Sequence, residues 1–159
     1  MAPNRGKKFE QQFKKDWLKA FPKSFILRLP DQQSGYFGTS KNLCDFICFT
    51  NKTLYLIECK TVKGNTFPIS NLTQLDYLSS MLAEDVIPGV VIWFYEKDKV
   101  VFVPINEIIR MRQDKLKSVN IKMVDDTTYN IIDIPSVKLK TFMRSDYTIL
   151  REAELNEVS

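Results

Sequence analysis

The segment 44–60, CDFICFTNKTLYLIECK, most constrains the fold of this chain. Two apolar stretches flank the polar residues 50–53, which predicts a β-hairpin. Side chains alternate between the faces of a strand, so folding back at this turn brings Asp45 beside Glu58 and Lys60. A surface salt bridge of Lys60 with one carboxylate is the ordinary explanation of such a triad. The apolar flanks instead predict buried strands, where charges are costly unless paired or bound to a metal, and therefore favour a functional site.

Hydrophobic periodicity and turn signals predict the other elements. Phe9, Phe13, Trp17 and Phe21 recur every four residues, which predicts an amphipathic helix over 5–21. The remaining expected elements are a strand at 24–29, a loop at 31–42, a helix at 70–84, a turn at Pro88-Gly89, strands at 90–95 and 100–103, a helix at 105–113, short strands near 120–124 and 130–134, and a helix after Ser136. This order predicts an α/β (α+β) fold with a mixed central β-sheet flanked by helices.

The absence of histidine narrows the chemistry that this chain can perform. It excludes catalytic triads, Cys-His dyads and His-ligated zinc, so a catalyst must rely on carboxylates, lysines or a bound metal. The three cysteines, Cys44, Cys48 and Cys59, are expected on the hairpin face opposite the charges, as small core residues rather than zinc ligands. The net charge of +4 is compatible with a polyanionic partner.

Length and hydropathy bound the organisation of the chain. Its 159 residues are expected to form a single domain over 1–159. There is no run of about 18 apolar residues and no signal-peptide core. We therefore expect a cytoplasmic protein without a membrane partner.

Two charged positions at the ends of consecutive expected strands, Asp45 and then Glu58-Cys59-Lys60, are separated by twelve residues. Within an α-β-β-β-α-β order, this pattern resembles the PD-(D/E)xK nuclease superfamily and its restriction-endonuclease-like core. Two further stretches resemble RecU-type Holliday junction resolvases. The first is Asn4-Arg5-Gly6 with Phe9-Glu10 near the N-terminus. The second is Thr66-Phe67-Pro68 with Asn71 and Gln74. The resemblance covers residues 4–80 and suggests a short member of that family, of the kind that a phage encodes, in a bacterial or infected host cell.

The resemblance implies a role for each matching residue. Asp45 and Glu58 match the acidic pair that binds the metal, and Lys60 matches the lysine that assists the attacking water. Glu10 matches a helical glutamate of junction resolvases. Gln74 matches a glutamine that completes the metal site.

The expected cofactor is Mg²⁺, for which Mn²⁺ substitutes, because carboxylate oxygens and the backbone carbonyl of Cys59 are hard ligands. Some assignments have alternatives. Glu10 sits at the edge of the apolar stripe, where it could simply be solvated, and Gln74 could close a capping box with Asn71 as the N-cap. Leu43 is a departure, since the family often has a hydroxyl residue two positions before the aspartate.

DNA is the implied partner, in particular the four-way junction. The residues expected to contact it are Arg5, Lys7, Lys8, Lys14, Tyr36, Phe37, Lys41 and Lys63. The basic side chains would bind phosphates and the two aromatic rings would stack on bases. A solvated helix face and simple loop packing are the alternatives.

The predicted function is a Mg²⁺-dependent endonuclease that cleaves four-way (Holliday) junctions in DNA recombination and repair. The alternatives are a nuclease of the same superfamily with another DNA substrate, of restriction or repair type, and a non-catalytic DNA-binding module. Because the junction has two-fold symmetry, a homodimer is expected. Its apolar interface would come from the hairpin 90–103 or from the strand 24–29.

Overall fold

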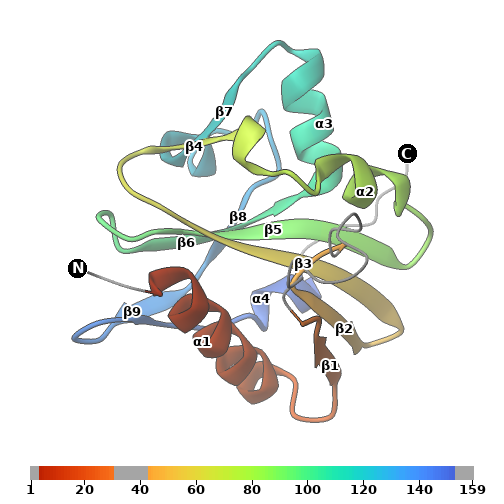
Figure 1. Cartoon of the computed structure of the whole chain (residues 1–159), viewed down its shortest axis with the longest axis vertical. Coiled ribbons are helices and arrows are strands. Elements are labelled where there is room, and N and C mark those ends of the chain that lie inside the picture. The colour runs from red at the N-terminus through yellow and green to blue at the C-terminus, as the bar shows by residue number, and fades with distance from the viewer. Residues whose placement is uncertain (1–3, 31–42, 153–159) are drawn as a thin grey trace, which may run out of the picture.

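The computed structural model describes residues 4–30 and 43–152 and has a six-stranded mixed sheet at its centre (Figure 1). The strands follow the order β1-β2-β3-β5-β6-β8, and their neighbours are antiparallel except for β3 and β5. The sheet consists of β1 (Phe25–Arg28), β2 (Phe46–Thr50), β3 (Thr53–Val62), β5 (Val86–Phe94), β6 (Lys99–Pro104) and β8 (Ile132–Ile134). This is the mixed sheet that the sequence predicted.

The remaining elements cover this sheet and extend it. They are the helices α1 (Arg5–Ala20), α2 (Leu75–Ser80), α3 (Ile105–Gln113) and α4 (Ile149–Glu152), the 3₁₀ turns η1 (Ile69–Asn71) and η2 (Ile121–Val124), and two small antiparallel pairs, β4 (Thr66–Pro68) with β7 (Ser118–Asn120) and β9 (Ser136–Lys138) with β10 (Met143–Ser145). The order α1-β1-β2-β3-α2-β5 is the predicted α-β-β-β-α-β core, with the short β4 and η1 inserted before α2.

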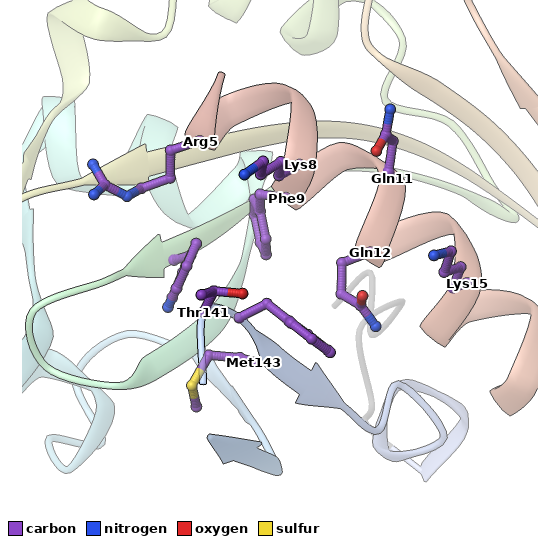
Figure 2. Close-up of a pocket in the computed structure, with 10 residues that line it drawn as sticks. Arg5, Lys8, Phe9, Gln11, Gln12, Lys15, Thr141 and Met143 are labelled. Atoms are coloured by element: carbon purple, nitrogen blue, oxygen red, sulfur yellow. The ribbon is translucent and has the colours of Figure 1, made fainter. Parts of the chain in front are cut away.

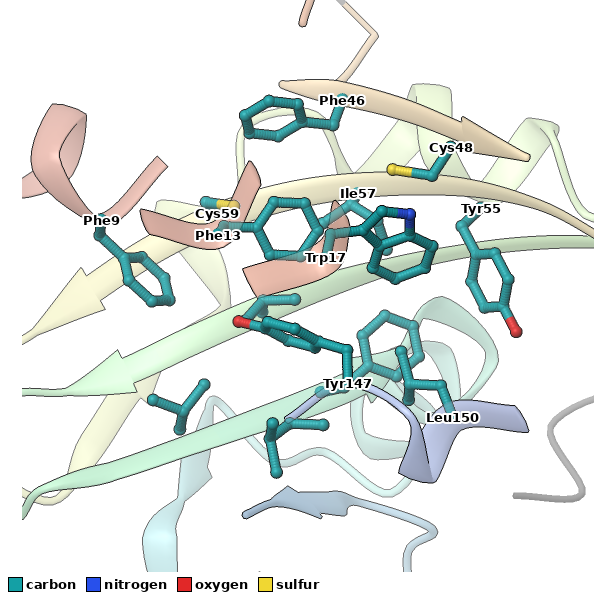
Figure 3. Packing of buried hydrophobic residues seen from close by; sticks show 14 of the residues in the cluster. Phe9, Phe13, Trp17, Phe46, Cys48, Tyr55, Ile57, Cys59, Tyr147 and Leu150 are labelled. Atoms are coloured by element: carbon teal, nitrogen blue, oxygen red, sulfur yellow. The ribbon is translucent and has the colours of Figure 1, made fainter. Parts of the chain in front are cut away.

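Helix α1 covers one face of the sheet because its aromatic stripe is apolar at helical spacing. Phe9, Phe13 and Trp17 are buried, and Figure 3 shows them gathered with Phe46 of β2 and Tyr147 of the C-terminal segment. Full burial of one such ring stabilises the fold by roughly 1.5–3 kcal/mol. The apolar stripe thus fixes which flanks of α1 remain free for polar side chains.

The opposite face packs against α2 and α3. Leu75 and Leu78 of α2 and Ile108 of α3 are buried in one cluster with Val90 and Ile92 of β5. Residues on β5 are therefore buried on both faces of the sheet, as expected for a strand that reads as a continuous apolar run.

The β2–β3 hairpin forms at the predicted turn. Asn51 and Lys52 both have positive φ values, 52° and 62°, which suits the right-handed twist of the flanking strands. Cys48 and Cys59 pack on the α1 side as expected, but Cys44 does not. It precedes β2, outside the strand alternation, and packs in the cluster of α2 and α3.

Several expected elements differ in the structure. The helix expected over 70–84 is only η1 and α2, because Leu82 is exposed and the chain turns back at Asp85, which has a positive φ of 61°. Pro88-Gly89 is not a turn but part of β5. The helix expected after Ser136 is the β9–β10 pair, and the strand expected near 120–124 ends early as β7 followed by η2. None of the helices in the described parts of the chain is long and apolar enough to span a membrane.

Candidate active site

Asp45 lies just before β2 and is fixed by backbone hydrogen bonds on both sides. Its N–H donates to the carbonyl of Ile57 over 3.0 Å, and its carbonyl accepts from the N–H of Leu29 over 2.8 Å. Its side-chain Oδ2 accepts from the backbone N–H of Cys59 at 2.9 Å. The carboxylate is therefore held against the end of the β2–β3 ladder by the sheet itself.

Glu58 and Lys60 share one face of β3, and the register places Glu58 opposite Asp45. The last pair of the ladder is Phe46 with Ile57, so the next positions along each strand are Asp45 and Glu58. Glu58 is only 2% exposed, and its Oε1 lies 4.0 Å from Nζ of Lys60. Its other oxygen, Oε2, is buried without a hydrogen-bond partner. A charge in this position is not a surface salt bridge.

Helix α1 adds Glu10 to this group, and β1 adds an arginine that sequence reasoning missed. Nη2 of Arg28 lies 3.4 Å from Oε2 of Glu10, whose side chain is only 12% exposed. The solvated alternative for Glu10 is therefore wrong. A sequence signal for Arg28 was present. Arg28 is a charged residue at the end of the apolar strand Phe25–Arg28, just as Lys60 is a charged residue that follows an apolar stretch of β3.

The carboxylates at this site raise one another's proton affinity. Burial, followed by a hydrogen bond and the charge of Asp45, raises the pKa of Glu58 to about 9, although Lys60 lowers it. Burial and the charge of Asp45 raise the pKa of Glu10 to about 7, although Arg28 lowers it. The raised pKa values of Glu58 and Glu10 mean that both carboxyl groups hold a proton to a higher pH than an exposed glutamate does.

The donor set fits a hard divalent cation. Two carboxylates, one of them with a buried and unpartnered oxygen, suit Mg²⁺, which is commonly bound through one or two carboxylates and keeps several waters. Within residues 4–30 and 43–152, no group of three or more His, Cys, Asp or Glu side chains is arranged to hold a metal ion by itself. Asp45 and Glu58 would hold the cation, and water and substrate oxygens would complete its coordination.

The match of this chain to a protein family covers both strands of the site. Residues 26–145 match the RecU family, described as recombination protein U. The chain belongs to the RecU family. The resemblance to RecU-type Holliday junction resolvases is thereby confirmed. The match extends further toward the C-terminus than expected and includes Asp45, Glu58 and Lys60, while Glu10 precedes it.

Two other comparisons add little to this assignment. The solved structure of Hjc, a Holliday junction resolvase from the archaeal hyperthermophile Archaeoglobus fulgidus, is 20% identical in sequence to this RecU chain, with a TM-score of 0.49. The similarity covers 64% of this chain and 78% of that one. The search among curated proteins gives no match.

Two of the predicted metal-site residues of this RecU protein contribute less directly. The thiol of Cys59 is buried and its pKa is raised well above the usual value by burial, so only its backbone is available as a ligand. Gln74 immediately precedes α2 without a side-chain capping bond, and its Oε1 accepts from the hydroxyl of Thr73 at 3.1 Å. The capping box with Asn71 is wrong, because Asn71 lies inside η1. The metal role of Gln74 stays a prediction.

The predicted DNA contacts divide between described and undescribed residues. Lys7, Lys8, Lys14 and Lys63 are exposed, and the guanidinium of Arg5 lies 3.8 Å from the centre of the Tyr95 ring. The other three predicted contacts, Tyr36, Phe37 and Lys41, lie outside the described residues.

Proposed function

We propose that this RecU protein is a divalent-metal-dependent endonuclease that cleaves four-way DNA junctions. The observation that carries the proposal is the buried Glu58, held beside Asp45 and Lys60 at the end of the hairpin with one oxygen unpartnered. A buried carboxylate that leaves one oxygen without a hydrogen-bond partner is costly in a purely structural role. The family assignment adds the recombination context.

The residues of the chain divide the chemistry among themselves. Bound between Asp45 and Glu58, Mg²⁺ would neutralise the phosphodiester and lower the pKa of a water ligand. The N–H of Cys59 donates to the Asp45 carboxylate and therefore points to the β2 side of β3. In a β-strand the carbonyl of a residue faces the same side as its N–H, so the Cys59 carbonyl is a further candidate ligand for the cation. Lys60 is partly exposed beside Glu58, where its ammonium group can orient the attacking water or stabilise charge on the phosphate.

The junction also has implications for assembly. One chain offers one set of Asp45, Glu58 and Lys60, whereas resolving a two-fold symmetric junction requires two matched nicks. A C₂ homodimer would supply both sites with the symmetry of the substrate.

The test is cleavage of a labelled four-way junction, a matched duplex and a single strand, with Mg²⁺ or with EDTA. We expect Mg²⁺-dependent cutting of the junction. Asp45→Asn, Glu58→Gln and Lys60→Ala should each lower the cleavage rate at least about 10²-fold. The first two weaken the site that would hold the cation, and the third removes a positive charge beside the phosphate. Junction binding should persist, since affinity comes mainly from basic contacts elsewhere.

Glu84→Gln and Lys97→Ala are matched controls, because both side chains are exposed and distant in sequence from the site. Both should cleave like the unmodified protein. Full activity in any of the three site variants, or undiminished activity in EDTA, would remove this site from consideration. Preferential cutting of duplex or single-stranded DNA would instead support a related nuclease with another substrate.

A further inference from the structure

A second candidate binding site lies on the far flank of α1, between this helix and the β9–β10 hairpin. A pocket of about 580 Å³ opens there, a size typical of ligand sites. Figure 2 shows Lys8 and Gln12 of α1 on one side and Thr141 and Met143 of the hairpin on the other. Trp93 of β5 also lines the pocket.

The pocket continues into a smaller hollow, which together with it we call the α1–hairpin groove. The hollow has a volume of about 160 Å³, shares Arg5, Trp93 and Phe142 with the pocket, and adds Lys138 and Lys140. The basic side chains that line the groove are Arg5, Lys8, Lys15, Lys138 and Lys140. The acidic side chain that lines it, Asp98, is already paired with Lys138 at 3.1 Å. The groove is therefore strongly cationic.

Helix geometry separates this groove from the carboxylate site. Lys8, Gln12 and Lys15 follow a spacing of four and then three residues, which places them on one flank of α1. Glu10 and Lys14 are four residues apart on another flank, roughly 200° around the helix from Lys8. The basic residues of α1 thus lie on two different flanks of the helix. Lys8 and Lys15 line the groove, whereas Glu10 and Lys14 do not.

The lining combines the groups that recognise a nucleotide. Phe142 is half-buried at the tip of the hairpin and offers a ring on which a base can stack. The side-chain amide of Gln12 can pair with the edge of a base, and the surrounding lysines suit its phosphates. Trp93 lines the groove although it is only 7% exposed, so part of its indole ring forms the apolar wall beside Phe142.

We propose that the α1–hairpin groove binds an unpaired nucleotide segment of the DNA substrate, with a base against Phe142 and Trp93 and the phosphates on Lys8 and Lys15. This inference rests on the proposed function only in taking DNA as the substrate. It adds a site for single-stranded DNA that is distinct from the carboxylates. An acidic peptide would satisfy the lysines but would leave the aromatic wall unused.

The test measures binding of pentathymidylate to the full chain in EDTA, through tryptophan fluorescence. The chain has two tryptophans, and Trp17 is fully buried in the core, so Trp93 should report the ligand. A pentamer of abasic sites and pentaglutamate are the comparison ligands. We expect pentathymidylate to change the fluorescence and to bind at least about fivefold more tightly than the abasic pentamer. The variant Trp93→Phe should lose the signal.

Two further variants locate the site. Phe142→Ala should weaken pentathymidylate binding at least about fivefold through lost stacking. Lys15→Glu should also weaken it, whereas Lys23→Glu, an identical charge reversal at an exposed position outside the groove, should have a much smaller effect. The lysine variants change only exposed side chains, so they remain informative if Phe142→Ala fails to fold.

The proposal is overturned if the two pentamers bind equally, if pentaglutamate binds as tightly as pentathymidylate, or if Lys23→Glu weakens binding as much as Lys15→Glu. Because the assay needs neither metal nor cleavage, its result is independent of the proposed function. A chain that binds pentathymidylate in this way but cuts no junction would contradict the nuclease alone. A chain that cuts junctions but shows no selective pentamer binding would contradict the groove alone.

Discussion

Glu58 illustrates how a single residue can conflict with the stability of the strand that carries it. Its neighbours on β3 are apolar and buried, so the carboxylate is desolvated and its pKa rises to about 9. Asp45 adds to this effect, and Lys60, at 4.0 Å, offsets only part of it. The charged form of Glu58 is therefore disfavoured in the folded protein without a cation beside it.

The first prediction concerns the stability of the metal-free protein against pH. Because the pKa of Glu58 is raised from 4.5 to about 9 on folding, the folded state holds its proton more tightly than the unfolded state. The resulting stabilisation is complete below pH 4.5 and is lost as the pH rises through about 9. Glu58→Gln removes this loss and should melt at least about 3 °C above the unmodified protein at pH 9 in EDTA.

Thermal unfolding between pH 5 and pH 9 measures this difference. The exposed variant Glu84→Gln should follow the unmodified protein throughout. If the difference in melting temperature between Glu58→Gln and the unmodified protein stays constant from pH 5 to pH 9, Glu58 does not titrate as described.

The second prediction concerns metal binding itself. Glu10, with a pKa raised to about 7, and Glu58 must release protons before they can act as carboxylate ligands or neighbours of a cation. Mg²⁺ affinity should therefore increase from pH 6 to pH 9, with proton release. Calorimetry in two buffers of different ionisation enthalpy measures this release, and a pH-independent affinity would contradict the prediction.

Ca²⁺ should support junction binding with little cutting, because its looser coordination misplaces the water.

At the scale of secondary structure, the two-residue turn of the β2–β3 hairpin sets the site. Asn51 and Lys52 fix the register that ends with Phe46 opposite Ile57. A slip by one residue would move every side chain of one strand to the other face of the sheet. Asp45 would then no longer lie opposite Glu58, so the chemistry depends on a turn at the other end of the hairpin.

The third prediction concerns Gly89, which leaves room on β5 for the ring of Phe102 from β6. A Cβ atom at this position would overlap the ring of Phe102 and meet the carbonyl of Val103 at 3.0 Å. Gly89→Ala should therefore lower the free energy of unfolding by about 1–3 kcal/mol through overpacking. Denaturant unfolding measures the change. Gly6→Ala on α1 is the control, because a Cβ there meets nothing within 4 Å, and it should be neutral or slightly stabilising.

At the scale of the whole molecule, the described residues of β1 and β2 expose a group of large apolar side chains. Phe25 and Leu27 of β1 and Phe49 of β2 are 56%, 46% and 48% exposed, and Phe25 pairs with Phe49 in the sheet. The sequence also suggested the hairpin 90–103 as a dimer interface. Its apolar side chains are buried within the chain and so cannot supply one. The strand at 24–29 is therefore the better candidate for contact with a second copy.

The fourth prediction follows for assembly. Leu27→Asp should weaken a homodimer at least about tenfold, because it places a charge in the apolar interface. Val137→Asp is the matched control, since Val137 is equally exposed on β9 but far along the chain from this surface, and it should leave the dimer intact. Analytical ultracentrifugation at micromolar protein distinguishes them. A strictly monomeric protein, free and on junction DNA, would favour a nicking nuclease of the same fold.

The sequence by itself determined the hairpin and the carboxylate pair. Period-two alternation, a polar turn and apolar flanks are local signals, and they were sufficient to place Asp45 beside Glu58 and Lys60. The aromatic stripe of α1 was equally local, because four-residue spacing defines one face of a helix. The lack of histidine limited the chemistry without any knowledge of the fold.

Only the tertiary structure decided which distant segments meet. Arg28 reaches Glu10 across 18 positions of the chain, and Phe142 meets the flank of α1 through a hairpin that the sequence presented as a helix. Likewise, Pro88-Gly89 reads as a turn locally but is held in β5 by pairing with β3 and β6. Local patterns specify faces within one segment, whereas contacts between segments depend on how the whole core buries them, and that burial overrides local preference.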